Sequence, residues 1–307
     1  MQRDNSSFSG VFAVIVASII WGTTGTAASF SPDVSPLATG AFAMGVAGIL
    51  LVLRSLRSLR RNAVLLRKNR VLLVVGALSV AVYPLAFYSS MRLSGVAIGT
   101  VISIATAPLF TVILERLISK KAISAQWFLS FLFGSAGVIL LTLGKQGGET
   151  SGLASGSQHW GILLGLVAAL AYAVYSWTAR KLILKGISSD SALAGQFGLA
   201  SLILLPSLHF TGSNLLTGQI NIAVAVYMAI VPMFVGYMLF GFGLKHIEAS
   251  KATLITLLEP AVATLLAIWV VGETFSIVGL TGMLAIAVCI ALQMIKIPQL
   301  ARVPNSY

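Results

Sequence analysis

Charged side chains are scarce in this sequence of 307 residues. Asp, Glu, Lys and Arg make up only 9% of it, whereas 57% of the residues are hydrophobic and the mean hydropathy is +0.96. A soluble domain carries about 25% charged residues, because its surface must face water. A surface that faces lipid needs no such cover of charge. The composition therefore excludes an ordinary soluble protein and predicts an integral membrane protein.

Disulfides, metal-ligand clusters and nucleotide-binding motifs are also missing. The single cysteine, Cys289, cannot form an internal disulfide and is interpreted as a small core residue. The three histidines, His159, His209 and His246, are far apart in the sequence and predict no metal site. The chain has no Gly-x-x-x-x-Gly-Lys-Ser/Thr stretch, which excludes an ATP-driven engine within it. No nucleophile is paired with a base, so we expect neither an enzyme nor a cofactor.

Ten apolar runs are long enough to cross a bilayer as helices, which takes roughly 20 residues each. Strands are excluded because an open sheet would leave backbone groups unpaired in lipid, and the runs are too long for barrel strands. The first run is too long for a signal-peptide core and is interpreted as a retained span. The runs are approximately 11–30, 37–53, 71–91, 96–114, 124–143, 160–179, 191–210, 220–241, 252–271 and 276–296.

Lys and Arg fall almost entirely into alternate loops. If the N-terminus is cytoplasmic, all but two of the 20 lie on the inside, the exceptions being Arg92 and Lys145. This bias predicts that both termini are cytoplasmic. The net charge of +12 is then explained by topology and contact with anionic lipid, not by nucleic acid. We interpret the most basic stretch, Arg54–Arg70, as a solvated cytoplasmic loop.

Two pairs of segments indicate an internal duplication. The stretch AIGTVISIATAP (Ala97–Pro108) matches ASKATLITLLEP (Ala249–Pro260), which lies 152 residues further along. The stretch ASIIWG (Ala17–Gly22) matches AALAYA (Ala168–Ala173) at an offset of 151. Offsets that agree this closely favour two copies of one unit.

Each predicted copy holds five spans, an odd number, so the second copy enters the membrane from the opposite side. The expected domains are a first five-helix repeat at 8–143, a linker at 144–159 and a second five-helix repeat at 160–297. Inverted repeats of this kind are common among secondary transporters. We therefore expect an all-α membrane protein with a substrate site near the midplane, between the repeats, that works by alternating access.

Several short motifs resemble the EamA family of the drug/metabolite transporter superfamily, over about residues 11–296. They are Ile20, Trp21 and Gly22, the mid-helix prolines, and Leu258, Glu259 and Pro260 followed by Val271, Gly272 and Glu273. The first half departs from the family pattern, because Ser119, Lys120 and Lys121 replace the usual Gly-Glu and Ala107 stands opposite Glu259. The resemblance implies secondary transport of small metabolites, typically export of amino acids and related compounds across the bacterial inner membrane.

Glu259 is the most distinctive residue within the spans. It lies about eight residues into the ninth span, roughly 12 Å deep. A charge at depth is costly, so the side chain must face protein or water, or be protonated. Pro260 follows it and frees the carbonyl of Thr256 from the helix. Two interpretations stay open: a carboxylate that binds a substrate ammonium group or a coupling proton, and a structural carboxyl that fixes helix packing.

Aromatic and amide side chains within the spans are the other candidates for a substrate cavity, and such a lining suits an amphipathic solute or an amine. The candidates are Trp21, Tyr83, Tyr172, Tyr175, Gln196 and Tyr237, with Pro84, Pro108 and Pro260 as kinks or hinges. Gln196 is equally compatible with packing between helices. Trp127, Trp160 and Trp269 lie near span ends and are interpreted as interface anchors.

The lead hypothesis is a proton- or gradient-coupled exporter of amino acids or related small metabolites. The alternative is a multidrug or quaternary-amine exporter of the same fold. A scaffold or an intramembrane enzyme is a weaker third hypothesis, because only one carboxylate is clearly intramembrane. The pairs Gly95/Gly99 and Gly161/Gly165 allow close helix contact, either within the monomer or in a homo-oligomer.

Overall fold

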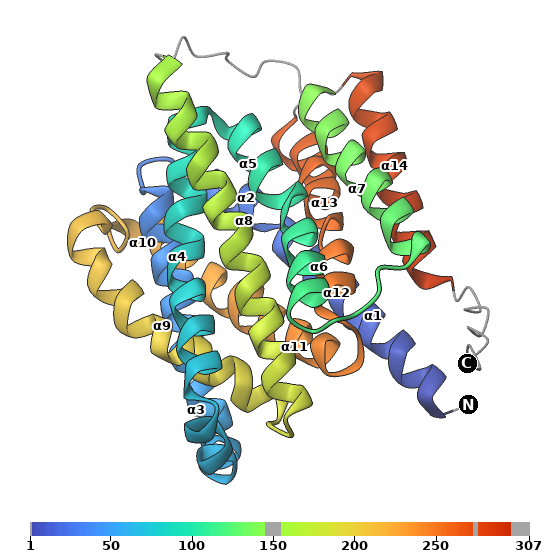
Figure 1. The fold of residues 1–307 in the computed structure, drawn as a ribbon. Helices are drawn as coiled ribbons and strands as arrows, with labels where there is room; N and C mark the ends of the chain where they lie inside the picture. Colours follow the sequence, from blue (N-terminus) through green and yellow to red (C-terminus); the bar gives the residue numbers. More distant parts are fainter. Residues whose placement is uncertain (1, 145–154, 273–275, 296–307) are drawn as a thin grey trace.

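The computed structural model describes residues 2–144, 155–272 and 276–295, and this part of the chain is built of helices (Figure 1). It contains ten candidate membrane spans, as the sequence predicts. The elements are α1 (Gln2–Gly22), α2 (Thr24–Ala28), α3 (Pro36–Lys68), α4 (Arg70–Ser94), α5 (Val96–Ala105), α6 (Ala107–Leu117), α7 (Ala125–Gly144), α8 (Ser155–Leu184), α9 (Ser189–Thr211), α10 (Gly218–Met228), η1 (Ala229–Val235), α11 (Gly236–His246), α12 (Ala249–Ile255), α13 (Leu258–Leu266), η2 (Ala267–Val271) and α14 (Ile277–Met294). Most of the predicted linker, and Glu273, lie outside the described residues.

The prediction of a loop over Arg54–Arg70 is wrong. Helix α3 continues to Lys68, and only Asn69 separates it from α4. At about 1.5 Å per residue its 33 residues reach roughly 50 Å, well beyond a hydrocarbon core of about 30 Å. The stretch contains no Gly or Pro and is rich in Leu and Arg, which favour helices. Its inner face also packs on α9, which stabilises the extension.

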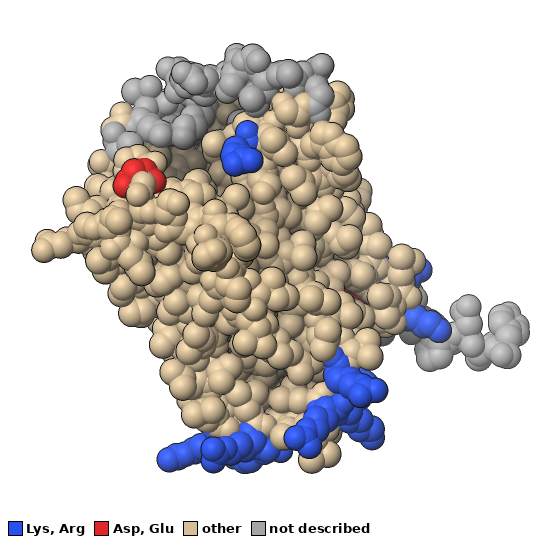
Figure 2. All heavy atoms as spheres, turned by 90° about the vertical axis from the view of Figure 1, so that its left-hand side faces the viewer, with Lys and Arg blue, Asp and Glu red and all other residues tan. Residues whose placement is uncertain are grey.

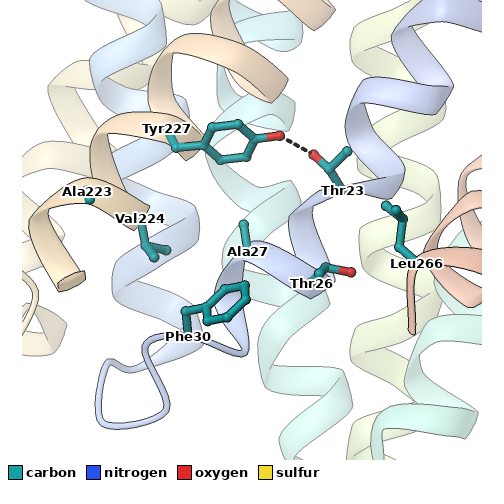
Figure 3. Close-up of a pocket in the computed structure, with 8 residues that line it drawn as sticks. All are labelled: Thr23, Thr26, Ala27, Phe30, Ala223, Val224, Tyr227 and Leu266. Carbon is teal, nitrogen blue, oxygen red and sulfur yellow. Dashed lines mark hydrogen bonds between the residues drawn. The ribbon is translucent and has the colours of Figure 1, made fainter. Parts of the chain in front are cut away.

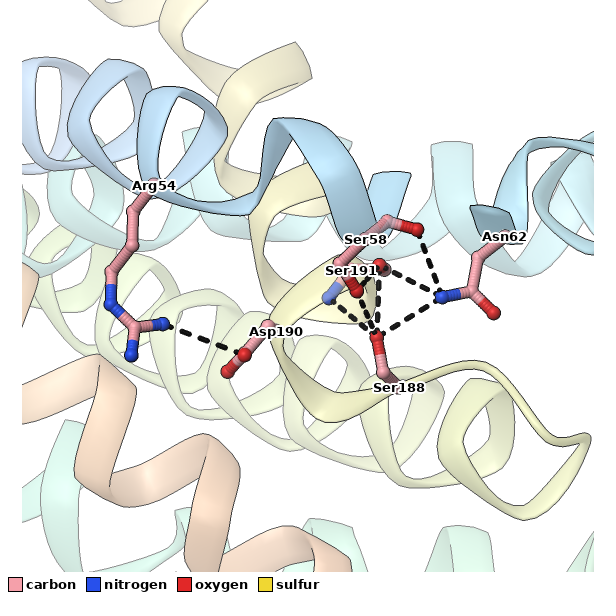
Figure 4. A network of polar contacts seen from close by, with 6 residues as sticks. All are labelled: Arg54, Ser58, Asn62, Ser188, Asp190 and Ser191. Atoms are coloured by element: carbon pink, nitrogen blue, oxygen red, sulfur yellow. Dashed lines mark hydrogen bonds and ion pairs between the residues drawn. The ribbon is translucent and has the colours of Figure 1, made fainter. Parts of the chain in front are cut away.

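A polar network fixes this extension to the start of α9 (Figure 4). The Ser58 hydroxyl lies 2.7 Å from that of Ser188 and 2.8 Å from that of Ser191, and the Asn62 amide donates to both hydroxyls at 3.1 Å. Ser188 also accepts the backbone N–H of Ser191, which caps α9. An ion pair between exposed side chains lies beside the network. Its members are Arg54 and Asp190, 3.5 Å apart.

The most extensive helix contacts join the first predicted repeat to the second: α4 with α8, α3 with α9, and α7 with α14. Glycines permit these contacts. A Cβ atom on Gly48 of α3 would lie 2.2 Å from the Ser201 hydroxyl of α9. On α8, Gly161 packs against the backbone of Ser94, and its carbonyl accepts the Ser90 hydroxyl at 2.7 Å. Gly161, one member of a predicted glycine pair, therefore makes a helix contact within the monomer, between α8 and α4.

Two spans are broken at matching positions. The fourth span breaks at Thr106, and Pro108 lies in the first turn of its second piece, α6. The ninth breaks at Thr256 and Leu257, and Pro260 lies in the first turn of α13. By contrast, Pro84 lies inside the single helix α4. The eighth span also contains a π-helical segment, η1, around Pro232, which was not among the predicted kinks.

Basic residues gather at one end of the molecule, where Figure 2 shows Lys and Arg side chains in a band. We call this the basic end; it is formed by residues 67–70, 118–124, 185–188 and 245–248. The two exposed tryptophans, Trp160 and Trp269, fit the predicted interface anchors, with 64% and 79% of their surface exposed. The same prediction is wrong for Trp127, which is buried and donates its indole N–H to the Ser250 carbonyl at 3.1 Å.

Candidate functional site

A small cavity of about 60 Å³ lies within the bundle. A cavity of this size holds only a few water molecules. Its lining comes from spans one, two, three, six, eight and nine, and so from both predicted repeats. The lining residues are Trp21, Thr24, Gly40, Met44, Tyr83, Pro84, Phe87, Tyr88, Tyr172, Tyr175, Met233, Tyr237 and Glu259.

Glu259 contributes the one acidic side chain of this lining. It lies in the first turn of α13, where the helix dipole favours a negative charge. Its backbone N–H donates to the Thr256 carbonyl at 3.0 Å, so the irregular backbone at the break is satisfied locally. Among the described residues, no hydrogen bond or ion pair engages its carboxylate. The carboxylate is thus held at the cavity wall without a partner.

Aromatic rings form most of the remaining wall. The ring of Tyr83 lies 5.8 Å from that of Phe87, 5.5 Å from that of Tyr172 and 6.0 Å from that of Tyr175. On the other side, the rings of Trp21 and Tyr237 lie 4.9 Å apart. These separations are typical of interacting aromatic pairs. The rings therefore support one another as a continuous cage.

Hydrogen bonds fix the orientation of this cage. Tyr172 donates its hydroxyl to the hydroxyl of Thr256 at 3.0 Å, beside the break of the ninth span. The hydroxyls of Tyr175 and Tyr237 lie 2.9 Å apart. The indole N–H of Trp21 donates to the Pro232 carbonyl at 2.8 Å, so the π-helical segment supplies an acceptor that a regular helix would keep to itself.

The structure brings six of the seven candidate site residues to this one cavity. They are Glu259, Trp21, Tyr83, Tyr172, Tyr175 and Tyr237. Gln196 is absent from the lining. It is fully buried, donates its amide to the Thr178 hydroxyl at 2.8 Å and packs against Gly76, a contact between α8, α9 and α4. This geometry corresponds to the packing interpretation that the sequence also allowed.

Tyr88 lines the cavity but was not among the sequence candidates. Its ring lies so close to α3 that a Cβ atom on Gly40 would come within 2.3 Å of it. The signal that could have found it is its place one residue after Phe87, one helical turn beyond Pro84. Met44 and Met233 also reach the lining, where their flexible side chains can adapt to different contents.

A second carboxylate, Glu115, joins α6 to α12 at the basic end. It is buried, accepts the backbone N–H of Ala249 at 3.0 Å, and accepts the hydroxyl of Ser250. Glu115 therefore caps the N-terminus of α12 from a different span. The Trp127 indole bonds the Ser250 carbonyl at the same place. We call these four residues the α6–α12 latch.

Charged groups surround the latch. Lys121 forms an ion pair with Glu248, the residue that precedes α12. The guanidinium of Arg180 donates to the carbonyls of Leu244 and Lys245, at 2.7 and 3.0 Å, and so caps the C-terminus of α11. These contacts join α6, α8, α11 and α12 at the basic end.

A larger pocket of about 380 Å³ lies beside α2 (Figure 3). Apolar side chains of α2, α10 and α13 form most of its wall, and the Thr23 and Tyr227 hydroxyls, 2.7 Å apart, lie at its edge. Thr23 lines this pocket, whereas Thr24 lines the cavity. The short helix α2 thus contributes to both spaces, with Thr26 and Ala27 in the pocket and Thr24 in the cavity. Among the described residues, no group of acidic, His or Cys side chains is arranged to hold a metal ion.

Comparison with known proteins agrees with this architecture. The chain is 28% identical over 266 residues to the uncharacterized transporter YwfM of Bacillus subtilis, a match that covers 86% of each chain. It is 25% identical to the uncharacterized inner membrane transporter YicL of Salmonella typhimurium, covering 92% of this chain and 93% of the relative. A crystal structure with 19% identity has the same fold, with a TM-score of 0.77 over 94% of this chain and 96% of that one.

The model of the EamA-like transporter family matches two segments, residues 8–143 and 159–295, which together cover nearly all of the sequence. The match agrees with the motifs around Trp21 and Glu259 and with the ten spans. The chain is a multi-pass membrane transporter, and it belongs to the EamA-like transporter family.

Proposed function

We propose that this transporter exports small metabolites that carry an amine, with amino acids and related compounds as the first candidates, by alternating access across the bacterial inner membrane. One observation carries the proposal: an unpartnered carboxylate, Glu259, in an aromatic cavity lined from both predicted repeats. Glycosidic, acyl-transfer or metal chemistry would need further acidic, nucleophilic or ligand side chains, which the described cavity lining does not supply.

The positive-inside bias orients the molecule. In the sequence, all but two of the Lys and Arg residues fall on the side of the spans that we assign to the cytoplasm, so the basic end and both termini are cytoplasmic in this proposal. The name of the Salmonella relative, an inner membrane transporter, supports the same location. The cavity then lies between a cytoplasmic side, closed by the α6–α12 latch, and an outer side that includes α2.

Alternating access requires the basic end to open, and the latch is what must separate. Glu115 belongs to the fourth span and Ala249 to the ninth, the two spans related by the 152-residue offset. Both spans are broken near their middle, at Thr106 and at Thr256. A broken helix can tilt one half without moving the other, which supports a motion of α6 against α12.

The same carboxylate offers a means of coupling to protons. If Glu259 binds either a proton or a substrate ammonium group, then loading of one displaces the other. A proton gradient directed inward would then drive amine export. This exclusive occupancy needs only one titratable group within the cavity, as the lining provides.

A second candidate function, export of quaternary amines or cationic drugs, rests on the aromatic wall. Trp21, Tyr83 and Tyr172 line the cavity, and the faces of aromatic rings attract organic cations. The methionines Met44 and Met233 make the wall adaptable, as multi-substrate sites require.

Growth and efflux assays test the proposal. Cells that express the wild type, Glu259→Gln or Glu248→Gln are challenged with toxic amino-acid analogues and with cationic dyes. We expect resistance and efflux with the wild type, their loss with Glu259→Gln, and their retention with Glu248→Gln, whose carboxylate lies at the basic end. Resistance that survives Glu259→Gln unchanged would show that this carboxylate is structural. If neither compound class is exported, the exporter proposal fails for both.

A further inference from the structure

We infer that the cavity selects organic cations whose amine is free and whose carboxylate is absent or masked, in preference to zwitterionic amino acids. The inference rests on the proposed function, because it names the substrate class of the same site. It also changes the order of the candidates named there, because it places amines without a free carboxylate ahead of the amino acids.

The first support is the charge balance of the lining. Glu259 is its one ionisable acid, and no Lys, Arg or His is present among the described residues that form it. Arg180 lies in α8, the helix that also carries Tyr175, but its guanidinium already donates to the carbonyls of Leu244 and Lys245. A cationic amine therefore finds a counter-ion in the cavity, whereas a substrate carboxylate finds none.

The second support concerns the neutral donors of the wall. Tyr172 donates to Thr256, Trp21 donates to Pro232, and the Tyr175 hydroxyl is paired with that of Tyr237. Thr24, in turn, donates to the Trp21 carbonyl at 2.8 Å. Most donors that could bind an anion are thus already engaged by the protein.

Two hydroxyls of the lining, those of Tyr83 and Tyr88, have no hydrogen-bond partner among the described residues. A phenol can donate one hydrogen bond, but it brings no positive charge. Each can equally accept an N–H from an ammonium group beside Glu259. These two residues are therefore compatible with an amine and do not neutralise a carboxylate.

The third support is the helix terminus nearest the cavity. The N-terminus of a broken span is the usual place for an anionic substrate group in transporters of this architecture. Here the first turn of α13 already contains Glu259, and its next residue, Pro260, has no N–H to donate. A substrate carboxylate at this terminus would meet the Glu259 carboxylate. The protein's own acid thus occupies the position that an anion would need.

A matched series of four compounds tests the inference on the purified full-length protein. The series is phenethylamine, phenylalanine methyl ester, phenylalanine and N-acetylphenylalanine, which share one aromatic side chain and differ in the amine and the carboxylate. Binding is measured by quenching of tryptophan fluorescence, since Trp21 lines the cavity, and uptake is measured in proteoliposomes. We expect the amine and the ester to bind at least roughly tenfold more tightly than phenylalanine, and the N-acetyl compound not to bind.

Variants separate the role of the charge from that of the fold. Glu259→Gln should remove the preference for the amine over phenylalanine, whereas Glu248→Gln, a carboxylate outside the cavity, should keep it. The wild-type series stands without either variant, so a Glu259→Gln protein that fails to fold leaves the test intact.

Two results overturn the inference: phenylalanine binding as tightly as its methyl ester, or N-acetylphenylalanine binding as tightly as either. Uptake separates this failure from failure of the proposed function. If phenylalanine is carried as well as the ester and carriage depends on Glu259, the proposed function holds and the selectivity inference is wrong. If the expected binding order holds but none of the four compounds crosses the membrane, the selectivity stands and the transport proposal for this class fails.

Discussion

Removing the Glu115 carboxylate should open the basic end of the protein. In the structure this side chain accepts the N–H of Ala249 at 3.0 Å and the hydroxyl of Ser250, and only 4% of Glu115 is exposed. Hydrogen bonds to a charged group contribute about 1.5–3 kcal/mol each. If α6 and α12 separate, these bonds are replaced by water. Glu115→Ala therefore destabilises the closed form more than the open form.

The two bonds together set the magnitude. At the lower limit they contribute about 3 kcal/mol, which corresponds to roughly a hundredfold change in the equilibrium between closed and open forms. Glu115→Gln keeps a neutral acceptor for the Ala249 N–H and should shift the equilibrium by about tenfold. Lys121→Ala removes only the exposed ion pair with Glu248, which contributes about 0–1 kcal/mol.

Cysteine modification provides the assay. Thr253 is buried one turn into α12, and Thr253→Cys is introduced with Cys289→Ala so that one thiol remains. We expect a maleimide added from the basic end to modify this cysteine faster in Glu115→Ala than in the parent, with Glu115→Gln between them and Lys121→Ala close to the parent. A cysteine at Thr264, in α13, should not change, which distinguishes opening from unfolding. Equal rates at position 253 in the parent and in Glu115→Ala would refute the latch.

Three further predictions concern other parts of the fold. Glu259→Gln should weaken amine binding by at least roughly 30-fold, because truncating one member of a buried charge pair costs about 2–5 kcal/mol; titration of phenethylamine checks this, and an unchanged affinity would remove Glu259 from the site. Gly48→Ala should lower the free energy of unfolding by about 1–3 kcal/mol, because its Cβ atom would lie 2.2 Å from the Ser201 hydroxyl and 2.4 Å from the Phe197 carbonyl oxygen; a thermal melt equal to that of the wild type would contradict the packing of α3 on α9. Thr23→Val removes the hydrogen bond to the Tyr227 hydroxyl, which contributes about 1 kcal/mol. Amide hydrogen exchange should become faster in α2 and stay unchanged in α9. Equal exchange in the wild type and the variant would show that this bond does not hold α2 in place.

Much of the cavity was predictable because its members lie at marked points in their spans. Glu259 is conspicuous as a carboxylate in apolar surroundings, and Trp21 and Tyr172 occur at matching points of the predicted repeats. A polar or amphipathic side chain deep in a span must find protein or water. That requirement alone directs such residues toward the bundle interior. Gln196 obeys the same rule, yet its partner is Thr178 at a helix contact, because the sequence does not reveal which interior position is hollow.

The α6–α12 latch was not predictable for a related reason. Glu115 lies near the end of the fourth span, among basic residues, where a carboxylate is ordinarily solvated. Its burial depends on Ala249 and Ser250, more than 130 residues away in the chain. The length of α3 was not predicted for another reason. The charges of its second half indicate that this half lies in water, but they do not distinguish a loop from a helix. A helix that extends beyond the membrane stays helical when its propensity and its contacts with α9 favour it.

The sequence by itself determined that the chain is a membrane protein with ten spans, because each span is set by its own hydrophobicity and length. It also marked the polar minority within the spans, because every such group has to be satisfied. Only the tertiary structure decided which of these residues converge around Glu259, which are used to join helices, and that a second carboxylate, Glu115, joins α6 to α12. Those outcomes depend on the packing of spans that are remote in the sequence, and the periodicity of a single helix carries no information about its neighbours.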